Sequence, residues 1–350
     1  MASPQTALQR ERFRLFLRIL MISVGIGAFY GILLTPDRAS PAVSVLIGIA
    51  NGLVISGVVA GSEIFLLREG SSMARLTRLP FIAVLLLKTV VYGAVVTAMV
   101  VGAPLVAAFI PAGMRPAPLD PHTASVTIGF SLATTAIFVI VLQAAGLLGR
   151  RTFRNLVLGR YRRPRAERRF FLFVDVIGST AIAERLGPLQ AHRFLAAVFS
   201  ATAEPIAACR GEIYQYVGDE IVITWTEEEG KPEARPLHCF FLMEKALLDL
   251  KASFRTQFAA EPGLRAALHL GEVIAGEVGE VRRAIVYHGD VMNTASRLEQ
   301  ATRELGCRFI ASAHAVQALG PQQDMEMKDL GALTLRGRKE AIQAFAVETR

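Results

Sequence analysis

Hydrophobic residues gather in the first 150 positions of the chain, in four long apolar segments separated by turn-rich pieces. Each segment is long enough to cross a bilayer as a helix of about 20 residues. The segments run approximately over residues 15–35, 41–66, 80–103 and 124–148. Residues 1–149 are therefore predicted to form an N-terminal all-α transmembrane bundle with four membrane helices.

The pattern changes in the second half, where short β-rich runs alternate with helical ones, as in an α+β domain. The run from Phe170 to Asp175 is predicted to be a buried strand that ends in a carboxylate. A turn and a helix N-cap follow at residues 178–180, and a long amphipathic helix is expected from there to about Cys209.

Further along the chain, two β-rich runs around a Gly-Asp turn predict a hairpin over residues 211–225. A helix to about Phe258 and a strand over residues 264–271 are expected next. The C-terminal domain is predicted to span residues 169–350.

Residues 150–168 join the two halves and are strongly basic. Positions 150–169 hold nine arginines against one acid, Glu167. They are predicted to form a solvated or lipid-facing linker. Their position also allows a second interpretation, in which they relay changes from the membrane half to the C-terminal domain.

Composition and charge agree with a membrane-anchored protein. Hydrophobic residues make up 52% of the chain and charged residues 19%, which is more apolar than soluble domains. The net charge of +8 comes largely from arginines beside the apolar segments. That placement indicates membrane orientation and anionic lipid headgroups, and it argues against nucleic-acid binding.

The basic residues also predict the orientation in the membrane. The N-terminal tail, the second connection and the region after Arg150 carry most of the arginines. Arg38 and Arg115, in the first and third connections, are each balanced by a nearby acid. Because basic loops stay in the cytoplasm, both termini and the C-terminal domain are expected on the cytoplasmic side of the inner (plasma) membrane.

Charged and small residues inside the apolar segments give further predictions. Glu63 and Lys88 lie within the second and third segments, where they either pair with each other or snorkel separately to the headgroups. Three Gly-x-x-x-Gly motifs, which begin at Gly27, Gly48 and Gly57, are of the kind that lets membrane helices approach closely.

Two carboxylates give the C-terminal domain its candidate chemistry. Asp175 ends an apolar strand and Asp219 lies at the tip of the predicted hairpin. If the two strands are neighbours, both acids reach one edge of the sheet, where a hard divalent cation can bind. Asn293 and Arg297 are four residues apart and share one helix face, which suits contact with a ribose and a phosphate.

The order of these motifs resembles the class III adenylate/guanylate cyclase catalytic domain. The motifs are Phe-x-Asp175, Val-Gly-Asp219-Glu, His269-x-Gly271 and Gly289-Asp290-x-x-Asn293-x-x-x-Arg297, and the resemblance covers about residues 168–350. It implies a ferredoxin-like, palm-like α+β fold with helices on one face of the sheet. It also implies a homodimer with active sites across the interface, which makes cyclic AMP and pyrophosphate from ATP.

The resemblance also implies roles for individual residues. Asp175, Asp219 and the backbone carbonyl of Val176 would hold two Mg²⁺ or Mn²⁺ ions. Asn293 of the partner chain would orient the ribose, and Arg297 would meet the charge that develops on the α-phosphate. The other expected nucleotide-binding residues are Gly178, Ser179, Thr180, Gln215, Val286 and Arg338, the last with Arg336 and Lys339 as close competitors.

Two positions depart from the family pattern. Adenylate cyclases of the family usually have a lysine where Gln215 stands and often Asp or Thr where Val286 stands, while guanylate cyclases use a Glu/Cys pair. The choice between ATP and GTP therefore stays open. Two other interpretations also stay open: a non-catalytic membrane sensor with a degenerate cyclase domain, and a diguanylate cyclase, against which the Asn293/Arg297 motif argues.

Overall fold

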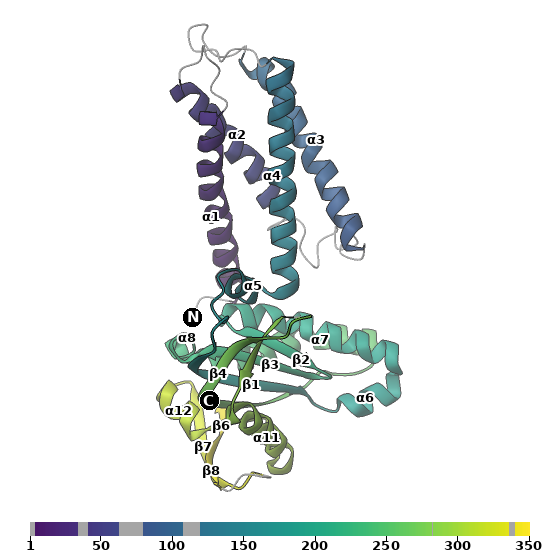
Figure 1. Ribbon diagram of the computed structural model, residues 1–350. Helices are drawn as coiled ribbons and strands as arrows, with labels where there is room; N and C mark the ends of the chain where they lie inside the picture. The colour runs from purple at the N-terminus through teal and green to yellow at the C-terminus, as the bar shows by residue number, and fades with distance from the viewer. Residues whose placement is uncertain (1–3, 34–40, 63–79, 108–119, 282, 336–339) are drawn as a thin grey trace. The chain divides into compact units, whose positions relative to one another are not determined.

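The computed structural model describes residues 4–33, 41–62, 80–107, 120–281, 283–335 and 340–350 (Figure 1). These residues divide into a helical unit, Gln9–Leu148, and a second compact unit that contains Gly149–Arg350. Each unit is described by itself.

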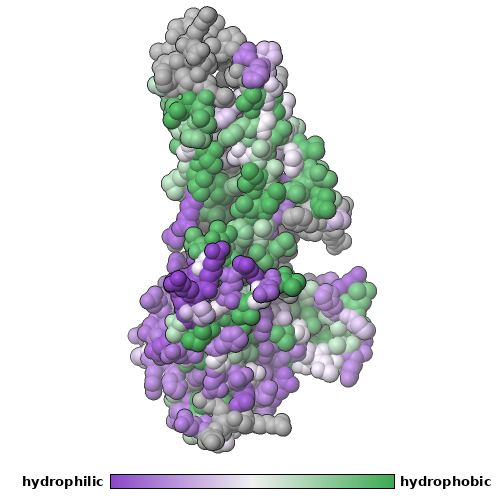
Figure 2. All heavy atoms as spheres, viewed as in Figure 1, coloured by the Kyte–Doolittle hydropathy of each residue, from purple (hydrophilic) through white to green (hydrophobic). Residues whose placement is uncertain are grey.

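Four helices make up the first unit. They are α1 (Pro4–Leu33), α2 (Pro41–Gly61), α3 (Phe81–Ala107) and α4 (Pro121–Leu148). Among the described residues, three stretches are long and apolar enough to span a membrane: Phe13–Leu33, Ser44–Gly61 and Ala124–Leu148. The apolar stretch of α3, Ile82–Ala98, is shorter. Hydrophobic side chains cover much of the visible outer surface of these helices (Figure 2), which supports membrane association; the fourth crossing stays a prediction.

Close approach of α1 and α2 depends on glycine. A Cβ atom added to Gly27 would collide with the carbonyl of Gly48, and one added to Gly31 would collide with the carbonyl of Ser44. Two of the three glycine motifs therefore lie at a helix contact. The third motif makes no such close backbone approach: a Cβ on Gly57 would meet nothing, and one on Gly61 would meet only the Phe16 side chain at 3.9 Å. Glu63 lies outside the described residues, so its pairing with Lys88 remains a prediction.

The second unit is built on one mixed sheet. Its strands are β1 (Arg165–Val176), β2 (Glu212–Val217), β3 (Glu220–Thr226), β4 (Leu264–Val278), β5 (Ala284–His288), β6 (Phe309–Ser312), β7 (Met325–Leu333) and β8 (Ile342–Thr349). Their order is β2-β3-β1-β4-β6-β8-β7, with β5 paired to β4. The β4–β6 pair is parallel and the other pairs are antiparallel. Strand β1 thus lies between β3 and β4.

Helices cover both faces of this sheet, so the expectation of helices on one face is wrong. They are α5 (Arg150–Val157), α6 (Ser179–Leu186), α7 (Pro188–Ala208), α8 (Glu227–Gly230), the 3₁₀ turn η4 (Pro232–Ala234), α9 (Arg235–Asp249), α10 (Lys251–Phe258), α11 (Asp290–Leu305) and α12 (Ala313–Leu319). Helices α7, α9, α10 and α12 contribute to the main hydrophobic core. Helix α11 packs on the other face, through Val291 and Ala295 against Phe171 and Phe173 of β1.

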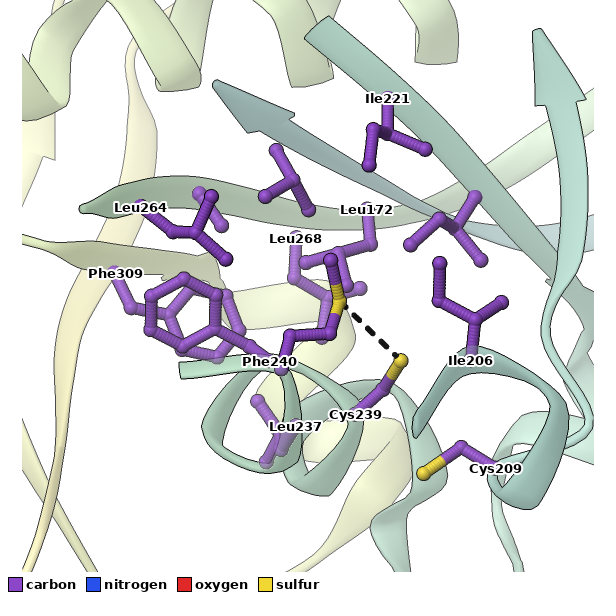
Figure 3. Close-up of a cluster of buried hydrophobic side chains, with 14 of the residues drawn as sticks. Leu172, Ile206, Cys209, Ile221, Leu237, Cys239, Phe240, Leu264, Leu268 and Phe309 are labelled. Carbon is purple, nitrogen blue, oxygen red and sulfur yellow. Dashed lines mark hydrogen bonds between the residues drawn. The ribbon is translucent and has the colours of Figure 1, made fainter. Parts of the chain in front are cut away.

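The main core joins alternate residues of the strands to the helices. Leu172 and Leu268 meet Ile206 and Phe240 there (Figure 3). Cys239 is buried in the same cluster and donates a weak hydrogen bond to the sulfur of Met243, at 3.8 Å. It packs here as a small hydrophobic side chain.

Several predicted boundaries differ from the structure. The long helix expected up to Cys209 is two helices, α6 and α7, because Gly187 adopts a φ of 74° and Pro188 starts a new helix. The strand expected over residues 264–271 continues as β4 to Val278, since its second half pairs with β5. The hairpin expected over residues 211–225 is present as β2 and β3.

The basic stretch before the sheet is structured. Its first part is helix α5, and its last residues begin β1 at Arg165. Arg151 of α5 forms ion pairs with Glu212, at 3.4 Å, and with Glu229. Asn155 is buried. The residues expected to form a linker therefore belong to the same compact unit as the sheet.

A buried arginine of β1 connects this strand to β2, β3 and β5 on the face where α11 packs. Arg169 of β1 is fully buried and donates to Glu167 and to Glu212, both at 2.9 Å. Its Nε donates to Thr224 of β3 at 3.1 Å. Its guanidinium carbon lies 4.6 Å from the ring centre of Tyr287 in β5. A buried charge with this many partners is stable only while all of them remain.

We expect Arg169→Met to destabilise the second unit by about 3–5 kcal/mol, because it leaves two carboxylates with much of their charge uncompensated. Trp225 is the chain's single tryptophan and is buried in this unit, so its fluorescence during thermal unfolding measures the effect. Arg168→Met is the matched control, since Arg168 is 54% exposed and pairs only at the surface with Glu227. Equal melting temperatures for both variants would contradict the assigned role of Arg169.

Candidate active site

Asp175 lies at the end of β1, as the sequence predicts. It is 3% exposed and stands in register between Glu220 of β3 and Arg265 of β4. Because successive strand residues alternate between faces, Asp175 shares the face of Phe171 and Phe173, on which α11 packs.

Asp219 is brought to the same place by the turn between β2 and β3. Gly218 has a φ of 63° in that turn, a left-handed conformation that glycine adopts without strain. Ser179, the first residue of α6, donates a hydrogen bond to Oδ2 of Asp219. Burial and the neighbouring Asp219 carboxylate raise the pKa of Asp175. The predicted pair of carboxylates is therefore assembled within one chain.

Two glutamates enlarge this acidic group. Burial raises the pKa of Glu220 to about 7, with added repulsion from Glu299, Asp175 and Asp219. Burial also raises the pKa of Glu299, a residue of α11 that is 4% exposed. Oε1 of Glu299 is buried without a hydrogen-bond partner among the described residues. Asp175, Asp219, Glu220 and Glu299 thus form a partly buried acidic cluster, which nearby positive charge would stabilise.

Part of that charge comes from two arginines. Nε of Arg265 and Nη2 of Arg303 each donate to Oδ2 of Asp175 at 2.9 Å. The same two residues lie 3.8 and 3.9 Å from Oε1 of Glu299. Both guanidinium groups lower the pKa of Asp175, although burial and Asp219 outweigh them.

The donor chemistry fits a hard divalent cation. Asp175 and Asp219 are carboxylates that raise each other's affinity for positive charge, and oxygen ligands of this kind suit Mg²⁺ and Mn²⁺. No group of three or more Asp, Glu, His or Cys side chains with metal-ligand geometry occurs in the described parts of the chain. Two carboxylates would therefore need further oxygen ligands, such as the carbonyl of Val176, a phosphate or water.

Asn293 and Arg297 lie on α11, as predicted, but on a different side of it from the residues that reach Asp175. At 100° per residue, Glu299 and Arg303 share one side of the helix, and Asn293 and Arg297 lie about 80–160° away from them. Asn293 is exposed and Arg297 half-buried. Neither side chain makes a hydrogen bond or ion pair within the described regions, in contrast to the side chain of Arg303. These side chains are thus not turned toward the carboxylates of their own chain.

The two positions expected to read the base are carried by β2 and β5, which are not adjacent strands of the sheet. Gln215 is exposed on β2, directly after a bulge at Tyr214, and Val286 is half-buried on β5. The rings of Tyr214 and Tyr287 lie 5.0 Å apart, which holds the two strands together at this point. Arg338, with its competitors Arg336 and Lys339, lies outside the described residues.

The remaining predictions at the site concern α6 and β4. Gly178 adopts a φ of 71° before α6, whose first residues are Ser179 and Thr180, so the expected turn and helix start are confirmed. His269 of β4 is buried, and its Nδ1 lies 2.7 Å from Oγ of Ser312. Ser312 caps α12 through the backbone of Ala315. This contact with the cap of α12 is consistent with the structural role expected for His269.

Four residues around Asp175 were not predicted: Glu220, Arg265, Glu299 and Arg303. Glu220 and Glu299 lie within or just after the cyclase-like motifs, so their positions in the sequence could have indicated a place near the site. Arg265 and Arg303 carried none, because isolated arginines near a strand start and a helix end are common on surfaces. Only the strand register and the packing of α11 bring them to Asp175.

Comparison with known proteins assigns the family. Residues 164–349 match the adenylate and guanylate cyclase catalytic domain, so the chain belongs to that family. Adenylate cyclase 2 of Rhizobium meliloti is 36% identical over 236 residues, which cover 67% of this chain and 65% of that protein. The adenylate cyclase of Anabaena cylindrica is 28% identical over 51% of this chain and 36% of its own length. This chain thus spans less than two thirds of either relative.

A solved structure agrees on the fold. A bacterial light-regulated adenylyl cyclase superimposes with a TM-score of 0.52 at 22% identity, covering 62% of this chain and 64% of that one. The second unit therefore has the class III cyclase fold expected from its motifs.

Stability should depend on pH through Glu220. Its pKa is near 7 in the folded protein and near 4.5 when unfolded. Between those values the folded state holds a proton that the unfolded chain releases, so stability falls as pH rises through this window. We expect Glu220→Gln to melt at a higher temperature than wild type at pH 8 and at nearly the same temperature at pH 5, measured by Trp225 fluorescence in EDTA. An equal shift at both pH values would disprove this assignment.

Proposed function

We propose that the protein is a membrane-bound nucleotide cyclase that converts ATP to 3′,5′-cyclic AMP and pyrophosphate. The observation that carries the proposal is the pairing of Asp175 and Asp219 at one edge of a cyclase-fold sheet. The names of the relatives, both adenylate cyclases, favour ATP over GTP.

Metal binding is assigned to Asp175 and Asp219, with help from the carbonyl of Val176. The bound Mg²⁺ or Mn²⁺ ions would neutralise the triphosphate and lower the pKa of the ribose 3′-hydroxyl. Oxygen O3′ then forms a bond to the α-phosphorus as the bond to the β-phosphate oxygen breaks. The 3′-hydroxyl proton would pass to solvent water, and pyrophosphate would leave with the electron pair of the broken bond.

The chain's other residues bind and orient the nucleotide. Backbone N–H groups at Gly178, Ser179 and Thr180 suit the phosphates, because a helix begins there. Arg297 is placed to stabilise charge that develops on the α-phosphate, and Asn293 to orient the ribose. Gln215 and Val286 would read the purine, and Arg338 would bind the terminal phosphate.

Dimerisation is part of the proposal. On α11, Arg303 bonds to Asp175, and Glu299 lies beside Arg303 and Arg265. Asn293 and Arg297 are on another side of the helix. A complete site therefore requires Asn293 and Arg297 from a second copy of the chain. An isologous dimer provides this twice, because each copy offers both halves.

The helical unit would anchor the enzyme. We infer a multi-pass protein of the inner (plasma) membrane, with both termini and the cyclase domain in the cytoplasm, on the distribution of arginines. Membrane lipid is then a partner, and nucleic acid is not.

The test is turnover by detergent-purified protein, offered ATP and GTP separately with Mg²⁺ or Mn²⁺. We expect cyclic AMP from ATP, identified by mass, and a fall of about 10³-fold or more for Asp219→Asn, which removes a metal ligand. Cyclic GMP alone would keep the mechanism and overturn the substrate. A lack of product from either nucleotide would support the sensor interpretation, which the residues Gln215 and Val286 favour.

A further inference from the structure

One carboxylate oxygen of Asp175 accepts hydrogen bonds from two positively charged side chains of the protein. Both Arg265 and Arg303 donate to Oδ2, each at 2.9 Å. If Asp175 is a metal ligand, as proposed above, a divalent ion has to share or take over a carboxylate that these arginines hold. The inference below rests on that assignment.

The two arginines are held very differently. Arg265 is 17% exposed and sits on β4 directly opposite Asp175 in the backbone ladder, so its position is fixed by the sheet. Arg303 is 56% exposed and reaches Asp175 from the last turn of α11. A long, exposed side chain at a helix end can change rotamer at little cost, whereas a buried one in a strand cannot.

An alternative acceptor lies beside Arg303. Nε of Arg303 is 3.9 Å from Oε1 of Glu299, the buried oxygen that has no hydrogen-bond partner in the described residues. A guanidinium that releases Asp175 can therefore bond to Glu299, four residues earlier on the same helix. Its own charge stays compensated, and the orphaned carboxylate oxygen gains a donor.

We propose that Arg303 competes with the divalent metal for Asp175 and thereby sets the metal affinity of the site. Arg265 holds the carboxylate in place. Arg303 occupies it until a metal ion binds and then moves to Glu299. Because a guanidinium next to a divalent cation is also repelled by it, Arg303 weakens metal binding in two ways.

The proposal predicts the sign of a mutational effect. In Arg303→Gln, the side chain stays polar but is shorter and loses its charge, so the protein should bind Mn²⁺ with a Kd lower by about threefold or more. Mn²⁺ binding is measured on the detergent-purified full chain from the electron paramagnetic resonance signal of the free ion, without nucleotide. Arg303→Lys keeps the charge and should stay near wild type.

Arg308→Gln is the matched control. Arg308 is 72% exposed and pairs with Glu244 at 3.0 Å, not with Asp175. The Arg308→Gln variant removes the same charge from the chain and should leave the Kd for Mn²⁺ unchanged. An equal effect of both variants would mean that only net charge matters, which would overturn the proposal.

The remaining outcomes are also decisive. If the Kd of Arg303→Gln for Mn²⁺ equals or exceeds that of wild type, Arg303 does not compete with the metal. A higher Kd would mean that Arg303 orients Asp175 for metal binding. If wild type binds no more Mn²⁺ than Asp219→Asn, the metal assignment itself fails. Failure of this inference and failure of the proposed function are thus distinguished.

Discussion

The antiparallel pairing of β1 with β3 and β4 is the constraint on which the candidate site depends. That register places Asp175 between Glu220 and Arg265, and the β2–β3 turn brings Asp219 to the same edge. A slip of one residue would turn Asp175 to the opposite face of the sheet, away from α11. The buried strand residues and the Arg169 network, which joins β1, β2, β3 and β5, hold this register at both the core and the polar face.

Helix α11 carries polar residues on two of its sides. Glu299 and Arg303 complete the charge balance around Asp175 of the same chain. Asn293 and Arg297 face another way and lack partners among the described residues. A composite site between two copies accounts for both facts.

Much of this could be predicted from sequence, because the signals were local. The strand before Asp175, the hairpin around Asp219 and the helix with Asn293 and Arg297 all follow from apolar patterning and turn residues. The break at Gly187 was missed, although the adjacent Gly187 and Pro188 are a local signal for a helix boundary. Arg265 and Arg303 were missed because their significance arises only from contacts between distant segments. The helical half was predicted from apolar length alone, and two of its three glycine motifs lie at the α1–α2 contact.

The most direct test of the central claim is complementation between Asp219→Ala and Arg297→Ala chains, which carry different tags and are purified together as a mixed dimer. A mixed dimer has one site with both defects and one intact site, so about half of the wild-type turnover of ATP is expected, while each variant alone is inactive. Mixed dimers no more active than the two variants alone would mean that each site lies within a single chain, and would contradict the composite site proposed here.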